Sequence, residues 1–487
     1  MLKKLGTFYP VLLAAFFVLS LFSYNIEEVS ITDMLIPLAI VVAGTLALLL
    51  ALRRFVKNHN KIALVVAYLV VLFFSYGYVR DVVFTDAIVN LKPNIILAST
   101  WSVLFVAGVF LILRAHRDFN MLTKLLQVVA VALVLIVVVS VGVGATSLEH
   151  AQTSEITNNN NPVLVDMDVL PDIYYIILDM YARNDTLTEL FGYNNTEFTN
   201  YLASKGFYTA TESCSNYGSS YLSVASSLCM NYHKPDITTT ESLYMLRDNE
   251  AAKFLKSRGY HYISVSSGID LIDMEHYAEV RMYEGIFGIE VSAFLKSLCD
   301  TTVLAPFARV VGGVHGANAI TYSFSALAEI PDIEEPTFCY AHILCPHPPW
   351  FFTVDGPRGL SLFGPGQNEM IKDGYLGNLE YVNKKVKVLV DILLAKSDVP
   401  PIIILQGDHG LVERERGLIE SEEFVHRFEI LNTYYLPNGG DELLYESISP
   451  VNSFRVVFNY YFDTDYELLE DCIWSIDSGV WLKLERE

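Results

Sequence analysis

The stretch that decides the fold is IYYIILD, in which the apolar run Ile173–Leu178 ends at Asp179. A second stretch of the same kind, IIILQGDHG at residues 402–410, carries an apolar run into Gly-Asp-His-Gly. Continuous apolar runs of this length suit strands that are covered on both faces, as in parallel sheets. We therefore expect two buried strands, each followed by polar side chains at its carboxyl end.

The chain around these runs alternates between helical and strand patterns. Residues 196–205, 242–257 and 378–394 have helical spacing, and residues 260–265 and 338–344 have strand character. This alternation predicts an α/β domain with a mostly parallel sheet and helices on both faces. In such sheets, ligands bind beyond the carboxyl ends of the strands.

Five apolar blocks precede this domain, at residues 8–23, 34–52, 62–79, 95–113 and 125–145. Each is about long enough to cross a hydrocarbon core of ~30 Å as a helix. A buried core helix is the alternative for any single block, but five in succession favour a membrane region. We expect a transmembrane region of five helices at 1–145, a polar linker at 146–168 and an extracytoplasmic catalytic domain at 169–487.

The basic residues of the connections predict the orientation in the membrane. They precede the first block and follow the second and fourth, at Lys3, Lys4, Arg53, Arg54, Lys57, Lys61, Arg114, Arg117 and Lys124. Basic loops stay on the cytoplasmic side. The N-terminus is therefore expected in the cytoplasm, and an odd number of spans places the catalytic domain outside the cell membrane.

Charge and cysteine use fit this placement. The first 150 residues carry 11 basic and 7 acidic side chains, a net charge of +4. The whole chain has a net charge of −22, so the remaining residues have a net charge of −26. A domain that acidic excludes nucleic acid as a partner, since nucleic-acid affinity comes largely from a basic surface. All six cysteines lie in the predicted external part, where a Cys214–Cys229 bridge and free buried thiols are both compatible with the sequence.

The two strand ends carry the residue types of a metal site. Asp408 and His409 supply a hard oxygen and an imidazole nitrogen, a mixed set that suits zinc or manganese. A surface turn is the alternative, because Asp and Gly are common turn residues. Asp179 at the end of a similarly buried strand favours the metal interpretation.

A serine-rich segment, residues 215–228, precedes or begins a helix near Ser219 or Ser220. A hydroxyl in the first turn of a helix lies beside free backbone N–H groups, which favour a bound phosphate or sulfate. A divalent metal can deprotonate such a hydroxyl and make it a nucleophile. A serine that only caps the helix is the alternative, and spacing alone does not select the nucleophile.

Two histidines lie near the end of another apolar segment. His347 stands among prolines in a loop past the strand, where it is a candidate for binding a substrate oxygen or a metal. His342 lies within the strand and is interpreted as a core histidine.

Together, segments 171–183, 215–232, 340–356, 402–410 and 430–437 resemble the sulfatase and alkaline-phosphatase superfamily. Within it they are similar to the membrane-anchored branch that includes lipoteichoic acid synthases and phosphoethanolamine transferases. Residues 449–465 look like a subgroup of sulfatase-like hydrolases and transferases. The resemblance covers nearly all of the external domain, and the five-span layout matches the same branch.

The resemblance implies a role for each candidate. Asp179, Asp408 and His409 would hold one divalent metal ion, manganese or zinc, with magnesium as a further candidate. Ser220 falls on the nucleophile position, which is Thr in most of that branch, and would also contact the metal. His347 would hold the substrate phosphate. Residues 218–219 depart from the usual pattern, which leaves the shape of this loop open.

Two further departures narrow the chemistry. Neither Ser220 nor Cys214 is followed by the Pro and Arg that conversion to formylglycine requires, so a formylglycine sulfatase is not expected. Two-metal phosphatases need a further set of Asp and His ligands, for which His347 is the only clear candidate, so we expect one metal ion. We expect transfer of a phosphoryl-type group, such as phosphoglycerol or phosphoethanolamine, from a membrane lipid to an envelope glycan through Ser220. The alternatives are an ester hydrolase and a non-catalytic polymer-binding protein.

Overall fold

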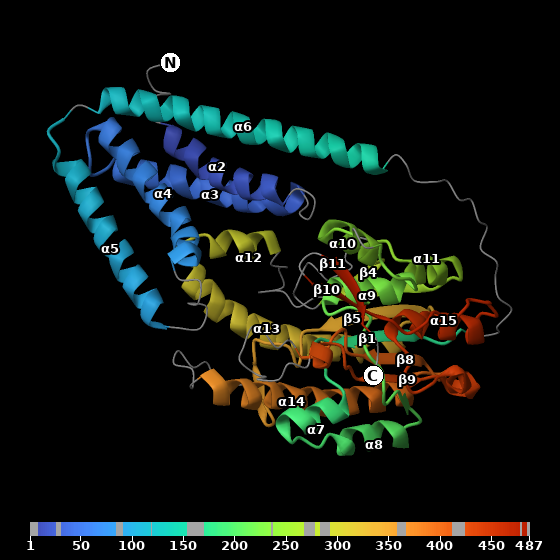
Figure 1. Cartoon of the computed structure of the whole chain (residues 1–487). Helices are drawn as coiled ribbons and strands as arrows, with labels where there is room; N and C mark the ends of the chain where they lie inside the picture. The colour runs from blue at the N-terminus through green and yellow to red at the C-terminus, as the bar shows by residue number, and fades with distance from the viewer. Residues whose placement is uncertain are drawn as a thin grey trace. The chain divides into compact units, whose positions relative to one another are not determined.

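The computed structural model describes residues 8–25, 31–83, 91–117, 119–152, 170–234, 237–266, 278–282, 293–357, 367–411, 424–477 and 480–484. The chain divides into two compact units, whose elements are labelled in Figure 1. The first comprises Met1–Asn159 with Val291–Gly312, and the second comprises Asn160–Glu290 with Gly313–Glu487.

The first unit is built from apolar helices: α2 (Tyr9–Tyr24), α3 (Ile31–Leu52), α4 (His59–Val83), α5 (Leu91–Arg114) and α6 (Asn120–Gln152). Within the described residues, four stretches are long and apolar enough to cross a membrane: Ile31–Leu52, His59–Arg80, Ile96–Arg114 and Asn120–Gly142. The prediction of five spans is therefore corrected to four. The first block forms α2, whose 16 residues give a helix of about 24 Å at ~1.5 Å per residue, short of a ~30 Å hydrocarbon core.

A stretch from the predicted catalytic domain also belongs to this unit. Residues 291–312 include α12 (Ala293–Asp300) and the start of α13 (Ala305–Leu327). α12 packs against α2 and α3, and its buried Phe294 and Leu298 join the apolar cluster of those helices. Of the predicted linker, residues 146–152 continue α6 and 153–168 lie outside the described residues.

A seven-stranded sheet forms the centre of the second unit, in the order β2-β9-β8-β1-β5-β3-β4. The strands are β1 (Ile173–Leu178), β2 (Tyr208–Thr209), β3 (His261–Val265), β4 (Val280–Met282), β5 (Thr337–Ile343), β8 (Ile402–Gln406) and β9 (Asn432–Tyr435). Strands β8, β1, β5, β3 and β4 are parallel, and β9 and β2 pair antiparallel at one edge. Two short hairpins pair β6 (Phe352–Thr353) with β7 (Gly356–Pro357) and β10 (Ile473–Asp477) with β11 (Val480–Leu484).

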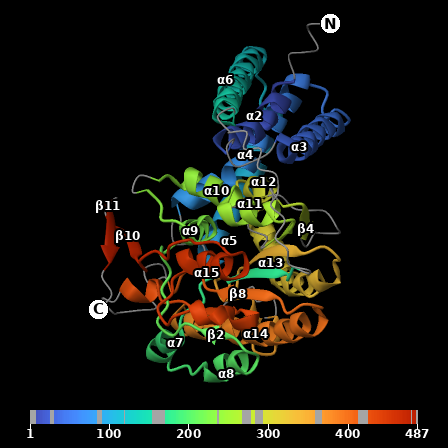
Figure 2. The same ribbon diagram turned by 90° about the vertical axis from the view of Figure 1, so that its right-hand side faces the viewer.

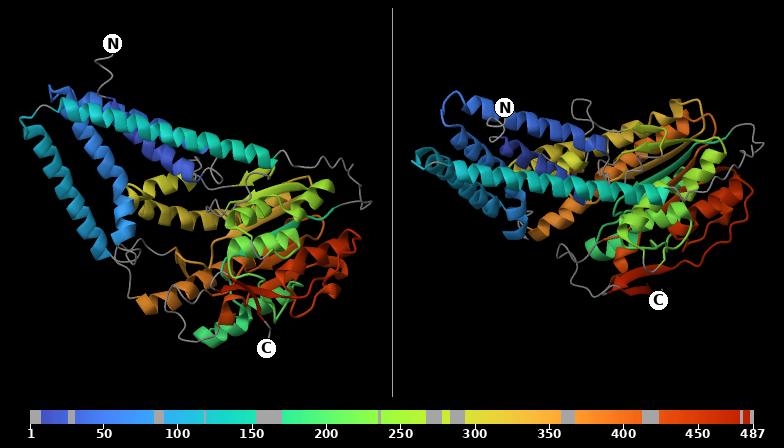
Figure 3. Two further views of the ribbon diagram at one scale, coloured as in Figure 1. Left: turned by 45° about the horizontal axis from the view of Figure 1, so that its top comes forward. Right: turned by 90° about the horizontal axis from the view of Figure 1, so that it is seen from above.

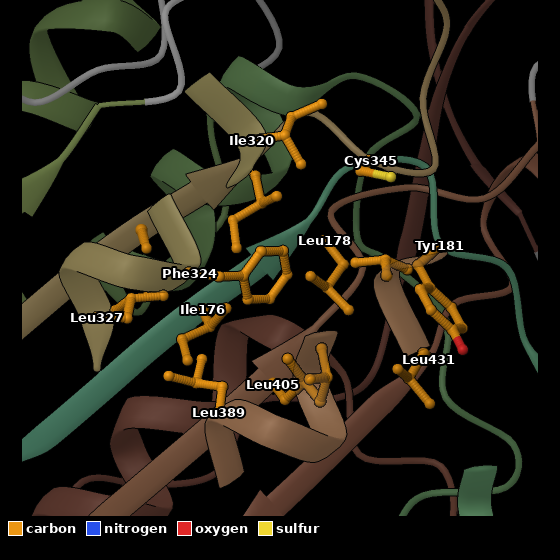
Figure 4. Close-up of a cluster of buried hydrophobic side chains, with 14 of the residues drawn as sticks. Ile176, Leu178, Tyr181, Ile320, Phe324, Leu327, Cys345, Leu389, Leu405 and Leu431 are labelled. Atoms are coloured by element: carbon orange, nitrogen blue, oxygen red, sulfur yellow. The ribbon is translucent and has the colours of Figure 1, made fainter. Parts of the chain in front are cut away.

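Helices cover both faces of this sheet, as the sequence predicts. Alternate residues of β1 face opposite ways. Ile176 and Leu178 lie in a cluster with α7 (Asn184–Phe191), α8 (Thr196–Ser204), α13 and α14 (Gln367–Lys396), part of which Figure 4 shows. Tyr175 and Ile177 lie in a second cluster with α9 (Ser220–Cys229), α10 (Thr239–Arg247), α11 (Glu250–Ser257) and α15 (Pro450–Tyr461). Figure 2 shows β8 between α15 and α14.

Two local expectations differ in detail from the structure. The helix expected at 242–257 is two helices, because Asn249 caps α11 by accepting a hydrogen bond from Ala252 N. All six cysteines are free, so Cys214 and Cys229 form no bridge. Cys229 lies at the far end of α9, a helix of 10 residues and therefore about 15 Å long, which separates it from the segment that precedes Ser220.

Candidate metal and phosphate site

Three of the predicted site residues meet at the carboxyl edge of the sheet. β1 and β8 are neighbours, with Ile177 beside Gln406, so the residues that follow them lie side by side. One ligand atom from each of Asp179, Asp408 and His409 lies within 4.8 Å of the others, and all three side chains are buried. The structure thus brings together residues that are more than 200 positions apart in the sequence.

The loop after β8 fixes Asp408 against the loop after β1. Asp408 Oδ1 accepts hydrogen bonds from Met180 N at 3.0 Å and from His409 N at 2.9 Å. The two glycines of Gly-Asp-His-Gly allow this arrangement because carbonyl oxygens of other loops approach their Cα atoms closely, not because their backbone angles are unusual. A Cβ on Gly407 would lie 2.6 Å from the Tyr181 carbonyl oxygen, and one on Gly410 would lie 2.1 Å from that of His426.

The His409 imidazole is oriented as a ligand. Its Nδ1 lies 2.8 Å from the Gly410 carbonyl oxygen, which can only accept, so Nδ1 carries the proton. Nε2 is then left with its lone pair, 3.8 Å from both Asp179 Oδ1 and Asp408 Oδ2. A backbone carbonyl that fixes the tautomer in this way is common for histidines that bind metals.

The carboxylates themselves indicate a cation. Asp179 Oδ1 and Asp408 Oδ2 are buried, and neither receives a hydrogen bond. Burial by itself raises the pKa of Asp179, but the imidazoles of His347, His342 and His409 together hold the pKa of this carboxyl below its usual range. Two buried carboxylate oxygens without a donor are costly unless a positive charge pairs them. Two carboxylate oxygens and an imidazole nitrogen fit a divalent ion such as zinc or manganese.

His342, interpreted from sequence as a core histidine, belongs to this site. Its Nε2 lies 3.3 Å from Asp179 Oδ2 and 3.6 Å from Asp408 Oδ2, and the side chain is fully buried. Strand parity explains its position. His342 is two residues after Tyr340, a residue of the cluster that contains Ile177, and Asp179 is two residues after Ile177. Residues two apart share a face of the sheet, and the register that sets Ile177 beside His342 then brings the histidine to Asp179.

His347 also lies at the site. Its backbone N–H donates to the Asp179 carbonyl oxygen at 3.1 Å, and its ring centroid lies 6.4 Å from that of His409. The ring Nδ1 contacts the carbonyl oxygen of Pro348. The imidazole is half-buried, whereas Asp179, Asp408 and His409 are buried.

Ser220 is the first residue of α9, as predicted. The N-cap residue Ser219 makes no side-chain capping bond, so it leaves the backbone N–H groups of the first turn to other acceptors. Tyr175 fixes the helix to the sheet: its hydroxyl lies 2.9 Å from Ser227 Oγ and 2.9 Å from Gln406 Oε1. α9 is therefore anchored to the face of the sheet on which Tyr175 and Ile177 lie.

Arg427, which sequence reasoning missed, connects the serine loop to the metal loop. Its carbonyl oxygen accepts from Gly410 N at 2.7 Å, and its Nε donates to the Gly218 carbonyl oxygen at 2.7 Å. A Cβ on Gly218 would lie 2.5 Å from Nε, so the glycine gives the guanidinium room. A single residue thus ties the loop before Ser220 to the loop that carries His409. No local sequence pattern marks it.

Comparisons with known proteins give structural matches only. No family model matches the sequence, and no curated protein matches it. Among solved structures, the chain is similar to the C-terminal periplasmic domain of EptC from Escherichia coli, at 11% identity and a TM-score of 0.45, over 68% of this chain and 94% of that one. The EptC domain has also been solved in complex with Zn.

Two further solved structures match as well. The integral membrane lipooligosaccharide phosphoethanolamine transferase A from Neisseria meningitidis matches at 11% identity and a TM-score of 0.42, over 93% of each chain. The lipoteichoic acid synthase LtaP from Listeria monocytogenes matches at 12% identity and a TM-score of 0.38, over 59% of this chain and 71% of that one. The function is argued from the residues of this chain.

Proposed function

We propose that this chain is a membrane-anchored, metal-dependent enzyme that transfers a phosphoryl-type group from a phosphodiester through Ser220. The observation that carries the proposal is the pair of buried, hydrogen-bond-deficient carboxylate oxygens of Asp179 and Asp408 beside His409 Nε2. Ser220, at the start of α9, would complete the set of ligands. The bound ion would lower the pKa of the serine hydroxyl and offset charge on the phosphoryl oxygens.

In the first half of the proposed reaction, the phosphoryl-type group moves from the lipid to Ser220. Ser220 Oγ forms a bond to phosphorus and loses its proton to water, while the bond from phosphorus to the lipid alcohol breaks. The alcohol leaves with that electron pair and takes up a proton. The backbone N–H groups of the first turn of α9 bind phosphoryl oxygens. His347, when protonated, donates to another of them.

The second half of the reaction regenerates the serine. An acceptor hydroxyl attacks the phosphoserine and loses its proton, and Ser220 Oγ recovers a proton as it leaves. The four membrane-length helices favour a lipid as donor. We propose an envelope glycan as acceptor and therefore a catalytic domain on the extracytoplasmic side, which with four spans requires the N-terminus on that side as well. Water in place of the glycan would make the same site a hydrolase of phosphate or sulfate esters.

Mass spectrometry of the trapped serine tests the assignment. The full chain in lipid nanodiscs, loaded with manganese or zinc, is incubated with phospholipids that carry isotope-labelled head groups. We expect a labelled adduct on Ser220, and a labelled glycan or a free labelled phosphate ester as product.

The variants separate chemistry from folding. Ser220→Ala should abolish both adduct and turnover and still bind metal through its other ligands. Ser219→Ala is the matched control, because the Ser219 side chain makes no capping bond, and it should keep both. Full turnover by Ser220→Ala would disprove the assignment.

A further inference from the structure

An apolar groove crosses the helices of the first unit. It encloses about 950 Å³ between α3, α4 and α5, and Val303 lines it together with these helices. Figure 3 shows the helices in blue to teal, with α12 in yellow. α4 holds α5 through Tyr68, whose hydroxyl donates to the Leu104 carbonyl oxygen at 2.7 Å and whose ring lies where a Cβ on Gly108 would be. All of these residues belong to one compact unit.

Three of the polar side chains that line the groove, those of Thr45, Ser102 and Trp101, are hydrogen-bonded to helix carbonyls. Thr45 Oγ1 donates to the Val41 carbonyl oxygen at 2.7 Å, and Ser102 Oγ donates to that of Ala98 at 2.8 Å. The indole N–H of Trp101 donates to the Leu72 carbonyl oxygen at 2.9 Å. A polar ligand would lose its hydration here and gain few hydrogen bonds, which disfavours a sugar or a head group. The lining suits hydrocarbon.

Val303, which lines the groove, belongs to the segment 301–303 between α12 and α13. Gly77 N donates to the Thr301 carbonyl oxygen at 3.0 Å, and Val303 N donates to that of Phe73 at 3.0 Å. In a regular helix, the Gly77 N–H donates to the Phe73 carbonyl oxygen. Here both of these backbone groups form hydrogen bonds with the segment 301–303. Only glycine allows this, because a Cβ on Gly77 would lie 2.1 Å from the Asp300 carbonyl oxygen.

From these contacts we infer that the groove is a binding site for one acyl chain of the phospholipid donor. The groove lies among helices of membrane-spanning length, where acyl chains surround the protein. Lipid tails are as apolar as the lining, so binding depends on van der Waals fit rather than on the hydrophobic effect. A volume of about 950 Å³ is within the range of pockets that enclose whole ligands. The identification of the bound lipid as donor rests on the proposed function.

Gly44 provides the decisive variant. It lines the groove, and a Cβ placed on it meets no atom within 4 Å, so Gly44→Phe is expected to place its ring in the groove. Gly142 is the matched control. It lies in α6, is exposed, has equally open surroundings and lies outside the groove, so Gly142→Phe adds the same ring to a membrane helix.

The experiment uses the full chain in nanodiscs that contain a phospholipid with a photoactivatable diazirine in one acyl chain. After illumination, we expect adducts concentrated on residues that line the groove, including Val303. Gly44→Phe should lose most of them, and Gly142→Phe should keep them. Adducts spread evenly over α3, α5 and α6, or unchanged in Gly44→Phe, would overturn the inference.

Two further measurements separate lipid binding from catalysis. Ser220→Ala should keep the labelling pattern, so a failure of the proposed chemistry leaves this result intact. In the active protein, Gly44→Phe should raise KM for the lipid donor on the order of tenfold and leave turnover of a water-soluble phosphodiester unchanged. Labelling in the groove with an unchanged KM would overturn the identification of the bound lipid as donor.

Discussion

The metal pocket (Asp179, Asp408 and His409) and the apolar groove of the first unit differ in how their polar atoms are hydrogen-bonded. In the pocket, the buried oxygens Asp179 Oδ1 and Asp408 Oδ2 receive no hydrogen bond. In the groove, the hydroxyl of Thr45 and the indole of Trp101 are bonded to helix carbonyls. A buried polar atom without a partner costs about 1–3 kcal/mol, and a charged one costs more. This contrast agrees with the two proposals, in which the pocket binds a cation and the groove binds hydrocarbon.

The largest effect is expected when one of the carboxylates is neutralised. Asp179→Asn removes the charge without changing the shape, so metal affinity should fall by more than the ~100-fold seen when outer partners of a metal site are removed. Metal content of the purified protein and a calorimetric titration measure this.

Asp172 at the opposite end of β1 gives the control. It is also a carboxylate, but its Oδ1 accepts from the backbone N–H and the hydroxyl of Thr337 at 2.9 and 2.8 Å, and Asn preserves an acceptor there. Asp172→Asn should bind metal normally. Equal metal loss in both variants would show that the effect is a general loss of folding, not of ligation.

The metal pocket was largely predictable because its signals are local in the sequence. Asp179 and Asp408 each follow a continuous apolar strand, and parallel strands end at a common edge. The close backbone approaches at Gly407 and Gly410 were not predictable, because the Tyr181 and His426 carbonyls that cause them come from other loops.

His342 was misread because a histidine inside an apolar strand is usually a core residue. Its charge partners come from two other strand ends, and only the register of the assembled sheet brings them within 3.6 Å. The segment 291–312 was missed for a similar reason. Its helical and apolar patterns are ordinary, and its packing with the membrane helices is a tertiary property.

An intermediate effect is expected at His342. Its Nε2 lies between the two carboxylates, so His342→Gln should weaken metal binding by about 10- to 100-fold, the range typical of residues that support metal ligands. The same titration measures it. Tyr340→Phe is the comparison, since the Tyr340 hydroxyl lies 3.3 Å from His342 Nδ1 on the side away from the carboxylates. If His342→Gln binds metal like the unaltered chain, the histidine is only a packing residue.

The smallest effect is expected in the groove, at Thr45. Its side chain is buried, and its hydroxyl is already bonded to the Val41 carbonyl oxygen in the same helix. Thr45→Val keeps the shape and removes only that internal bond, so acyl-chain labelling should stay within about twofold of the original, because no hydrogen bond to the ligand is lost. A large loss of labelling in Thr45→Val would mean that the groove recognises a polar group. The contrast with the metal pocket, where neutralising one carboxylate is expected to lower metal affinity more than ~100-fold, would then fail.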